Sequence, residues 1–518
     1  MAKIMDVSRP LLPEILGLHG KWRSSKAAII HPGGISTWSD FVSATNRIAN
    51  GLRERGLCAG DRVGLIMSND LATIEVIFGL IRAGMVAVPI NLSAPDAAIA
   101  RMLNDAGVVA LFVTGDQVAR AESIRRGLPD LRSDGLFVAG LPSVPPEWTS
   151  YSAWLVEQSP TDLGVAVEGS TIANIIYSSG TTGTPKGIAH TQQSRLDWAY
   201  DLALALRYHS GARTLLTLGL YSNISWVMML CTLLTGGTLI LQQRFDAEAA
   251  LRAIAQHAVT HTAMVPVQYR RLLSCPDIGA FDLSSVQSVM SCGSALPPDL
   301  KATLLETFRC GVIELYGVTE GVITTLDPED APGRLASVGK PIQGTDIRVI
   351  DDSGRDVAPG ESGEIVGLCR FTMEGYWNRL AATAEATWID EQGRGWLRTG
   401  DIGRLDADGF LYIVDRKKDM ILSGGQNIFP ADIESVLLAH PAVIECAVIG
   451  VPHPEWGETP LAVVVLGANK FTADDLRAWL NERVGRQQRI SAVMFSEQLP
   501  RNPNGKVLKR ELRALFEA

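Results

Sequence analysis

The sequence lacks an excess of positive charge. Its 518 residues include 47 Lys and Arg against 56 Asp and Glu, which gives a formal net charge of -9. A protein that binds the nucleic-acid backbone normally carries clustered surplus positive charge. We therefore exclude a nucleic-acid partner, whereas a locally positive pocket for an anionic small molecule is still compatible with this balance.

Cysteine pairs and metal-ligand clusters are also missing. The seven cysteines are scattered, odd in number and never form a C-x-x-C motif. This pattern is typical of reduced, mostly buried thiols in a cytoplasmic protein. His257 and His261 lie four residues apart, but no glutamate follows the first of them. We interpret both as solvated histidines at a helix end rather than as zinc ligands.

No apolar run is long enough to suggest a membrane-spanning helix. The strongest candidate, residues 226–242 (WVMMLCTLLTGGTLILQ), is short and is interrupted by Gly236-Gly237. This pattern predicts a buried helix, a tight turn and a core strand. The first twenty residues contain no small-residue cleavage site, so we expect no signal peptide. A cytoplasmic protein without integral membrane association is expected.

Strand and helix patterns alternate along the first part of the chain. Helical periodicity covers residues 37–56 and 71–83, and strand patterns cover residues 62–67 and 85–90. Such alternation predicts mainly parallel sheets that are covered by helices on both faces. After about residue 337, short strand patterns and Gly/Asp turns predict an antiparallel, barrel-like section instead.

A charged run divides the chain into two predicted domains. Residues 415–419 (DRKKD) separate two apolar segments. We predict an α/β fold in which a large N-terminal domain, residues 1–415, contains stacked αβ subdomains and the barrel-like section. A small α+β C-terminal domain, residues 416–518, is expected to be hinged to it and mobile, so that a cleft lies between the two domains.

The most informative segment is residues 177–187 (YSSGTTGTPKG), which follows the apolar strand pattern at 172–176. Glycines allow backbone amides to approach a ligand closely, hydroxyls add short donors, and a lysine supplies a positive charge. This chemistry suits triphosphate oxygens, although the spacing is not that of a Walker loop. The candidate ATP-binding residues here are Ser178, Ser179, Gly180, Thr181, Thr182, Gly183, Thr184 and Lys186.

This segment resembles the phosphate-binding signature of the adenylate-forming superfamily, which contains acyl-CoA synthetases, firefly luciferase and peptide-synthetase adenylation domains. Four further segments match the same family in the same order: residues 316–320 (YGVTE), 399–401 (TGD), 415–419 (DRKKD) and 500–506 (PRNPNGK). Each motif alone is weak, but five in order are not coincidence. The resemblance covers nearly the whole chain and is strongest with AMP-forming fatty or aryl acid–CoA ligases.

The resemblance implies roles for the reacting groups. Lys186 and the threonines of its segment would hold the β- and γ-phosphates of ATP. Thr319 would contact the α-phosphate, and Glu320 would hold Mg²⁺, a hard cation that takes oxygen ligands. Lys506 would bridge the substrate carboxylate and the α-phosphate while acyl-AMP forms, as a preorganised electrostatic donor.

The resemblance also implies how the nucleoside is held. Gly293, Ser294 and Ala295 would form one wall of the adenine slot, with Tyr316 and Gly317 on the other. Asp401 would accept hydrogen bonds from both ribose hydroxyls, because a carboxylate can accept two donors from a vicinal diol. Arg416 would lie near the ribose.

A second set of positions concerns the thiol. Lys418 occupies the hinge position of the family, where rotation of the small domain would withdraw Lys506 and present another face. Gly424 and Gly425 would leave room for the pantetheine arm of CoA. Trp456 and Arg489 resemble positions that contact the CoA nucleotide in aryl-CoA ligases, although a tryptophan here could also be a core residue.

The acid is predicted to lack an α-amine. Residues 219–226 (GLYSNISW) contain no acidic residue, whereas family members that select amino acids usually have an aspartate there, and a buried ammonium without a counter-charge is costly. Tyr221 is followed by Ser222, where the family usually has histidine. Without a cation in the apolar segments, an uncharged medium-chain fatty or aromatic acid is expected. The predicted acyl pocket consists of Tyr221, Ser222, Trp226, Met264, Val265 and Val318, with Met229 and Met290 nearby.

The final acceptor and the assembly remain open at this stage. The chain stops a few residues after Lys506, so we expect a diffusible thiol, with CoA the simplest candidate. The alternative is a stand-alone ligase that loads a separate acyl-carrier protein. A luciferase-type oxygenase has no positive sign in the sequence, and a non-catalytic sensor is disfavoured because Lys506 and Glu320 are both present. A homodimer is one possibility for the oligomeric state.

Overall fold

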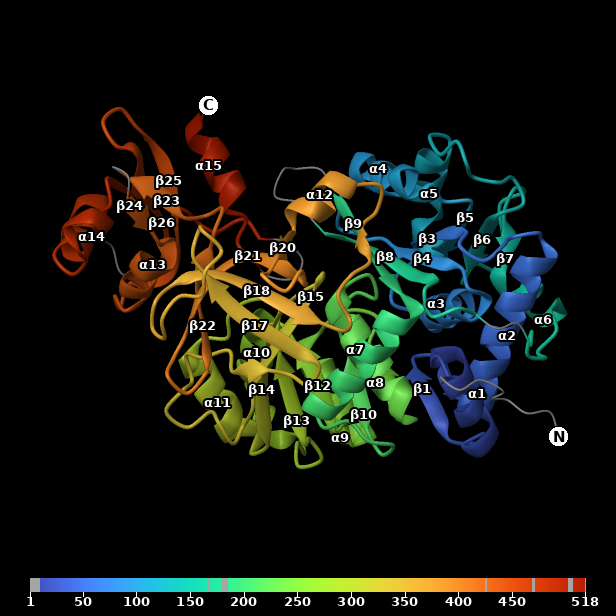
Figure 1. Cartoon of the computed structure of the whole chain (residues 1–518). Helices are drawn as coiled ribbons and strands as arrows, with labels where there is room; N and C mark the ends of the chain where they lie inside the picture. The colour runs from blue at the N-terminus through green and yellow to red at the C-terminus, as the bar shows by residue number, and fades with distance from the viewer. Residues whose placement is uncertain are drawn as a thin grey trace.

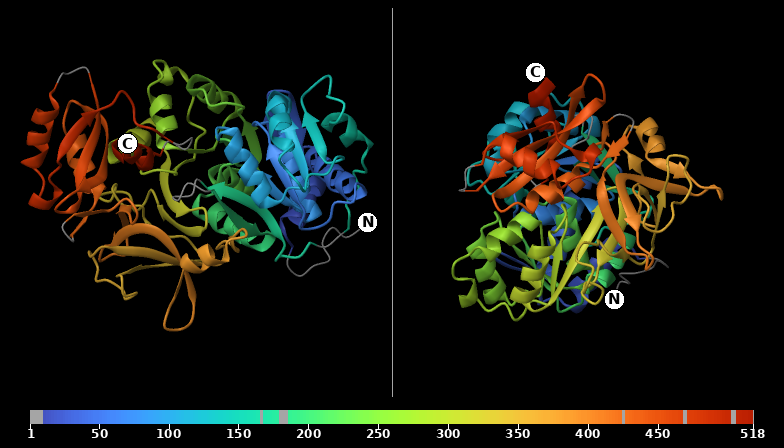
Figure 2. Two further views of the ribbon diagram at one scale, coloured as in Figure 1. Left: turned by 90° about the horizontal axis from the view of Figure 1, so that it is seen from above. Right: turned by 90° about the vertical axis from the view of Figure 1, so that its left-hand side faces the viewer.

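The computed structural model describes residues 10–164, 167–178, 185–423, 426–467, 471–501 and 506–517. These residues form two large mixed sheets, an antiparallel sheet and a separate C-terminal sheet. Figure 1 shows the C-terminal part (red) beside the antiparallel strands (orange) and away from the N-terminal sheet (blue), and Figure 2 shows the same separation from above. The predicted α/β fold with a large N-terminal and a small C-terminal part is confirmed.

The first sheet is built mainly from parallel strands in the order β19-β9-β8-β4-β3-β5-β6-β7. Its strands are β3 (Arg62–Ile66), β4 (Val86–Pro89), β5 (Ala110–Thr114), β6 (Leu136–Ala139), β7 (Thr149–Ser150), β8 (Ile172–Ser178), β9 (Lys186–Thr191) and β19 (Gly375–Tyr376). Its helices are α1 (Leu12–Trp22), α2 (Trp38–Glu54), α3 (Leu71–Ala83), α4 (Asp96–Ala106), α5 (Val118–Arg125) and α6 (Tyr151–Glu157). The helix and strand patterns of residues 37–90 therefore predicted these elements to within two residues at each end.

The second sheet has nine strands in the order β16-β15-β14-β13-β12-β10-β11-β1-β2. Its strands are β1 (Ala27–His31), β2 (Gly34–Thr37), β10 (Arg213–Leu216), β11 (Thr238–Leu241), β12 (His261–Met264), β13 (Ser288–Ser291), β14 (Gly311–Val318), β15 (Gly321–Leu326) and β16 (Lys340–Pro341). Its helices are α7 (Gln192–Ala205), α8 (Asn223–Thr235), α9 (Ala247–His257), α10 (Pro266–Leu273) and α11 (Pro298–Phe308). The apolar segment 226–242 is the predicted buried helix, turn and core strand, with Gly236 at φ 76° closing α8.

The two large sheets share one central layer of helices. On β5, Ala110 and Phe112 face a core that also contains α1, α2, α3, α7 and α8, whereas Leu111 and Val113 face α4 and α5. The far face of the second sheet packs on α9, α10 and α11. This alternation follows the two-residue period of a strand, and it produces five layers in which helices cover both faces of each sheet.

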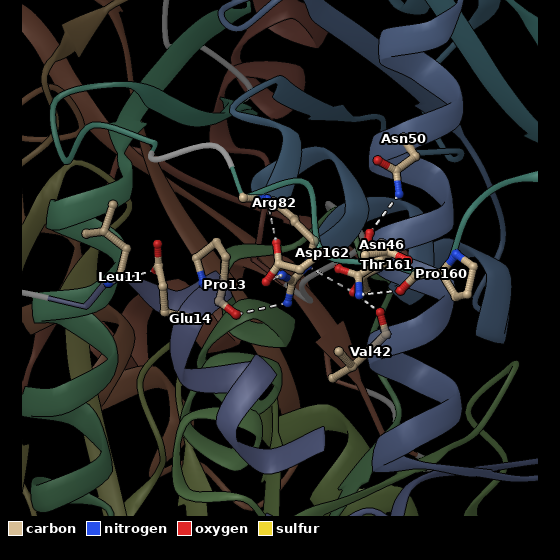
Figure 3. Close-up of polar contacts among 12 residues, drawn as sticks. Leu11, Pro13, Glu14, Val42, Asn46, Asn50, Arg82, Pro160, Thr161 and Asp162 are labelled. Atoms are coloured by element: carbon tan, nitrogen blue, oxygen red, sulfur yellow. Dashed lines mark hydrogen bonds and ion pairs between the residues drawn. The ribbon is translucent and has the colours of Figure 1, made fainter. Parts of the chain in front are cut away.

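Buried polar contacts hold the N-terminal helices to the segment that precedes β8. Arg82 of α3 donates to the carbonyl of Pro13 at 2.9 Å and lies 3.5 Å from the carboxylate of Asp162. On α2, the amide of Asn46 donates to the carbonyl of Pro160, and the amide of Asn50 to that of Thr161, both at 2.8 Å. Figure 3 shows how these side chains converge between the three helices.

The antiparallel section predicted after residue 337 is a five-stranded sheet in the order β17-β18-β21-β20, with β22 paired to β21. Its elements are β17 (Thr345–Ile350), β18 (Gly363–Cys369), α12 (Leu380–Glu385), β20 (Thr387–Ile389), β21 (Gly395–Leu405) and β22 (Leu411–Arg416). Its own small core includes residues of β15 and β9, so this sheet packs against the edges of both large sheets.

The C-terminal part has a separate hydrophobic core of its own. Its elements are β23 (Ile421–Ser423), β24 (Gln426–Ile428), α13 (Pro430–Leu438), β25 (Val443–His453), β26 (Gly457–Leu466), α14 (Ala473–Asn481), β27 (Ala492–Phe495) and α15 (Lys509–Glu517). Within the described residues, none of the helices is both long and apolar enough to cross a membrane.

Candidate active site

The predicted phosphate loop joins two paired strands. Ser178 at the end of β8 is the register partner of Lys186 at the start of β9. Ser179, Gly180, Thr181, Thr182, Gly183 and Thr184 lie outside the described residues. The ammonium of Lys186 lies 4.7 Å from the ring centroid of Tyr376, on the edge strand β19. The two strand ends that flank the predicted loop therefore pair with each other, and Lys186 lies beside Tyr376.

The Thr319–Glu320 pair forms the tip of the hairpin between β14 and β15, where Val318 pairs with Gly321. Tyr376 donates its hydroxyl to Oε1 of Glu320 at 2.8 Å. Burial, and then the charge of Glu320, raise the pKa of Tyr376, so its phenol stays a donor. Lys186 and Glu320 thus both contact Tyr376, Lys186 over the face of the ring and Glu320 at its hydroxyl.

A buried histidine holds the other side of this hairpin tip. Nε2 of His190 on β9 lies 2.9 Å from the carbonyl oxygen of Thr319. A carbonyl only accepts hydrogen bonds, so Nε2 must carry the proton and Nδ1 must be a lone-pair acceptor. Burial, and then the charge of Arg195, lower the pKa of His190 well below its usual value, which keeps the ring neutral.

The predicted nucleoside residues meet around one carboxylate. Tyr316 donates its hydroxyl to Oδ2 of Asp401 at 2.8 Å, and Nε of Arg416 lies 2.6 Å from Oδ1. Burial, and then the charge of Asp401, raise the pKa of Tyr316 well above its usual value. Asp401 is almost fully buried. This group joins the second sheet to the antiparallel sheet.

Two glycines beside this group are required by space and backbone conformation. A Cβ on Gly317 would lie 2.8 Å from the carbonyl oxygen of Val322. Gly293 has φ 89°, a conformation that favours glycine, and a Cβ there would meet Ile224 at 3.0 Å and Val265 at 3.2 Å. Ser294 and Ala295 follow in the same loop, whose continuation is held by the amide of Leu296 donating to Glu314.

The charge of the same carboxylate acts on a lysine near the C-terminus. Lys506 is half-buried, and burial, followed by the positive charge of Arg416, lowers its pKa to about 8. The charges of Asp401, Lys418 and Asp419 also act on it. The protonation of this lysine is therefore influenced by the charges of Arg416 and Asp401, two of the predicted nucleoside residues.

The predicted hinge residue lies between two differently anchored neighbours. The backbone amide of Lys417 donates to the carbonyl of Gly400, and its ammonium lies 3.1 Å from Glu364, both in the N-terminal part. Asp419 instead pairs with Arg513 of the C-terminal helix α15 at 3.4 Å. Lys418 is exposed in the turn between them. Lys418 thus lies between a residue held by the N-terminal part and a residue that pairs with the C-terminal helix.

The predicted CoA residues are on the surface of the C-terminal part where they are described. Gly424 and Gly425 lie outside the described residues. Trp456 is 52% exposed and stacks on His453 with ring centroids 4.6 Å apart, so it is not a core residue. Arg489 is also exposed.

The predicted acyl pocket is only partly assembled. Ser222 caps α8, with its hydroxyl accepting from the amide of Ile224, and Tyr221 is half-buried just before it. Trp226 and Val265 belong to the central core together with Met229 and Met290. Met264 instead packs with α9, α10 and α11, because neighbouring residues of a strand face opposite sides of the sheet. Val318 packs toward the antiparallel sheet instead.

Two other expectations from the sequence need correction. His261 is not a solvated histidine, because it lies buried in β12 between Thr260 and the carbonyl of Arg207. Of the seven free cysteines, Cys231 and Cys292 are buried and Cys58 is exposed, so the thiols are not mostly buried.

Sequence reasoning missed Tyr376, His190 and Arg195, which contact the predicted site residues. Tyr376 reaches Glu320 because β19 pairs with β9 in a register that sets Tyr376 opposite Ile188. That pairing joins segments almost two hundred residues apart, and no local pattern indicates it. The only signal for His190 was that it is a polar residue inside an apolar strand. The only signal for Arg195 was that it is a polar residue at the start of a buried helix.

The described residues contain no group of three or more His, Cys, Asp or Glu side chains that could hold a metal ion. Glu320 is the one predicted metal ligand, and its carboxylate accepts a hydrogen bond from Tyr376, whose ring also contacts Lys186. A single carboxylate beside a phosphate-binding loop suits Mg²⁺, which is commonly held by one or two carboxylates together with substrate phosphates.

The fold and these residues define a two-domain α/β enzyme with a nucleotide site in the larger domain, and comparisons with known proteins identify its family. The family model described as AMP-binding enzyme matches residues 20–377, and the model described as AMP-binding enzyme C-terminal domain matches residues 432–506. The chain belongs to the AMP-binding enzymes, the adenylate-forming superfamily that its motifs predicted.

Relatives with established names cover nearly the whole chain. A feruloyl-CoA synthase from an Amycolatopsis species is 35% identical over 94% of this chain and 96% of its own length. The long-chain-fatty-acid–CoA ligase FadD13 of Mycobacterium tuberculosis is 33% identical over 93% of each chain. The crystal structure of the anthranilate CoA ligase AuaEII in complex with anthranoyl-AMP superposes with a TM-score of 0.88 at 27% identity, covering 100% of this chain and 99% of that one.

Proposed function

We propose that this chain is an AMP-forming acyl-CoA synthetase. In the first step an oxygen of the substrate carboxylate attacks the α-phosphorus of ATP, and the bond to the departing pyrophosphate breaks. In the second step the sulfur of CoA attacks the acyl carbon, the thiol loses its proton, and AMP leaves. The observation that carries this proposal is the Tyr316–Asp401–Arg416 group, whose tyrosine lies on the strand that leads to Thr319 and to the Glu320 carboxylate held by Tyr376.

The N-terminal domain supplies the groups for ATP. Lys186 and the loop before it would bind the β- and γ-phosphates, and the Thr319 hydroxyl would bind the α-phosphate. Glu320, fixed by Tyr376, would hold Mg²⁺, which neutralises charge on the departing pyrophosphate when it is bound. Gly293, Ser294, Ala295, Tyr316 and Gly317 would hold the adenine, and Asp401 with Arg416 the ribose.

Lys506 would act only in the first step. Its ammonium would be close to both the attacking carboxylate and the α-phosphate, and a preorganised cation stabilises the charge that accumulates there. Rotation about Lys418 would then remove Lys506 and bring Gly424, Gly425, Trp456 and Arg489 to the acyl-AMP. The different anchoring of Lys417 and Asp419 supports this division into residues 1–415 and a mobile part, residues 416–518.

The acid would lack an α-amine, because residues 219–226 provide no carboxylate to pair with an ammonium. Ser222 takes the position expected for histidine and is used as the cap of α8. At the start of α8, the predicted acyl pocket therefore contains a small, uncharged side chain. A medium-chain fatty acid or an aromatic acid fits the apolar surroundings of Trp226 and Val265. The cytoplasmic location and a homodimer remain predictions from the sequence.

The test measures both half-reactions separately. ATP–pyrophosphate exchange should depend on the acid, and AMP release should be stimulated by CoA. Lys506→Ala should lower exchange roughly 10²- to 10³-fold, the usual cost of removing one preorganised donor. Lys509→Ala, which removes a lysine paired with Glu434 in the same domain, is the matched control and should retain exchange.

The identity of the thiol that accepts the acyl group distinguishes a CoA ligase from a ligase that loads an acyl-carrier protein. Acid-dependent exchange without CoA-stimulated AMP release, but with release stimulated by an acyl-carrier protein, would replace the CoA ligase by a stand-alone acyl-AMP ligase. Absence of exchange with fatty, cyclic and aromatic acids alike would reject both.

A further inference from the structure

A positively charged side chain is buried beside the predicted acyl segment, and no carboxylate of the described residues pairs with it. Arg195, in the first turn of α7, is 3% exposed. Its Nε donates to Oδ1 of Asn174 at 2.8 Å, and its Nη1 to Oδ1 of Asn223 at 2.9 Å. Its guanidinium carbon lies 4.8 Å from the ring centroid of Trp198 and 5.0 Å from that of Trp226. Neutral amides and indole rings therefore surround this cation.

Several polar atoms around Arg195 have no hydrogen-bond partner within the described part of the chain. They are Nη2 of Arg195, Nδ2 of Asn174 and Nδ1 of His190. We call Arg195, Asn174, Asn223 and His190 the arginine cluster. A buried polar atom without a partner is costly, and a buried charge without a counter-charge more so. Burial of the arginine cluster therefore lowers the free energy of unfolding, and the stability of the fold gives no reason for its presence.

The unsatisfied atoms are mostly donors. A guanidinium and an amide NH₂ group can only donate, and Nδ1 of His190 is the single acceptor because Nε2 carries the proton. Burial lowers the pKa of Arg195 to about 9, so the guanidinium still carries its charge at neutral pH. What the cluster lacks is an oxygen acceptor, and a negatively charged one would be the best complement.

The cluster also lies next to the reacting centre. His190 binds the carbonyl of Thr319, whose side chain is predicted to contact the α-phosphate. Asn223 directly follows Ser222 at the start of α8. The next residue, Ile224, lies against Gly293, where an added Cβ would be 3.0 Å from its side chain. An acid that is activated at Thr319 and extends along the start of α8 would therefore bring its tail toward Arg195.

We propose that Arg195 recognises an oxygen acceptor on the tail of the acid, in addition to the carboxylate that is activated. This inference rests on the proposed function and narrows its substrate class. The favoured acids are dicarboxylic acids and aromatic acids with a ring oxygen, whereas plain fatty acids and unsubstituted aromatic acids are disfavoured. A site with a buried donor rejects an analogue that lacks the acceptor, because the donor is then left unpaired.

This assignment changes the expectation from the sequence that the tail is uncharged. That expectation considered only cations in the segments around residues 219–226 and 264–265. Arg195 lies 28 positions before Asn223 along the chain and reaches it because α7 packs against α8.

The experiment compares matched pairs of acids. ATP–pyrophosphate exchange is measured with nonanoate against nonanedioate, and with cinnamate against 4-hydroxycinnamate. The native protein should show a kcat/KM for at least one oxygenated member that is roughly 10- to 100-fold higher than for its partner, the range expected for one hydrogen bond to a charged group. The two pairs separate a carboxylate from a phenol as the group that is recognised.

Two variants test whether Arg195 causes the preference. Arg195→Met removes the charge while filling similar space, and Asn223→Asp supplies an internal carboxylate that would occupy the guanidinium. Both should abolish the preference for the oxygenated acid while exchange with the plain partner stays within about threefold or rises. Arg82→Met is the control, because Arg82 is a buried arginine in the N-terminal helices, away from the site. It should leave the preference unchanged.

Opposite results overturn the inference. Native preference for the plain member of both pairs would do so, and so would an equal loss for both members of a pair in Arg195→Met, which would indicate a purely structural role. If no acid supports exchange, the proposed function fails instead. Binding of the free acids is then measured by quenching of tryptophan fluorescence, since Trp198 and Trp226 flank Arg195. Equal dissociation constants within both pairs would reject the recognition as well.

Discussion

Tyr316 on β14 donates its hydroxyl to Asp401 on β21 across 2.8 Å, while Arg416 on β22 holds the other oxygen of the same carboxylate. One buried carboxylate is therefore fixed from the nine-stranded sheet on one side and from the last strand before the hinge on the other. A nucleotide that binds here meets an acceptor whose position is already determined, which lowers the ordering cost of binding.

Replacing Tyr316 by Phe tests this relationship. The ring that would stack on adenine stays, but Asp401 loses one donor and is held by Arg416 alone. We expect the KM for ATP to rise roughly 5-fold with little change in kcat, which corresponds to about 1 kcal/mol of binding that is shared by ground and transition states. Tyr412→Phe is the control, because the Tyr412 hydroxyl donates to Asp406 in a turn at 3.3 Å. Equal effects of the two substitutions would contradict the role of Tyr316.

The pH dependence of the first half-reaction tests Lys506. Its pKa is lowered to about 8, chiefly by burial. The protonated form is the active one, and protons are lost as pH rises, so kcat/KM for ATP in pyrophosphate exchange should fall above about pH 8. This profile reports the free enzyme. Lys506→Arg should be slower overall but should not show this descending limb, because a guanidinium stays charged. The same limb in both proteins would assign it to another group.

The hinge is tested by separating the two half-reactions. Lys418→Pro fixes φ in the turn that connects the anchored residues Lys417 and Asp419. Exchange should stay within about threefold of the native rate, whereas attack of CoA on supplied acyl-AMP should fall at least tenfold. Lys506→Ala should produce the reverse pattern. Collapse of exchange in Lys418→Pro would show that rotation does not occur at this residue.

The predictions from sequence succeeded where the physical cause is local. The strand and helix periods of residues 37–90 and the glycine at position 236 determine their elements through neighbours in the chain. The apolar strand pattern at residues 172–176 likewise predicted β8, which leads to the segment that ends in Lys186 at the start of β9. These patterns need no knowledge of how distant segments pair.

The predictions failed where the outcome depends on distant pairing or on which face a side chain takes. Tyr376 meets Glu320 only because β19 joins the edge of the first sheet. Met264 and Val265 are adjacent in sequence but belong to cores on opposite faces of the second sheet. The buried position of Arg195 depends on the packing of α7 against α8. Composition alone contains none of this information.

A last prediction concerns stability rather than catalysis. Glu75 on α3 is buried and accepts a hydrogen bond from the Tyr151 hydroxyl at 2.7 Å. Burial raises the pKa of Glu75 to about 7, above the value of about 4.3 expected in an unfolded chain. Below about pH 4 the carboxyl is protonated in both the folded and the unfolded state. As pH rises from about 4 to 7, the unfolded chain loses this proton while the folded protein keeps it, so the free energy of unfolding falls by a total on the order of 3 kcal/mol.

Glu75→Gln removes this ionisation and keeps an oxygen that can accept from Tyr151. We expect the apparent Tm of the N-terminal domain to rise by a few degrees at pH 8 and to change little at pH 5, measured by differential scanning fluorimetry. Glu54→Gln, an exposed position at the end of α2, should leave both values unchanged. A lower Tm for Glu75→Gln at both pH values would contradict this prediction. It would mean that the native carboxyl stabilises the folded state even when it is ionised, through contacts that outweigh the cost of its burial.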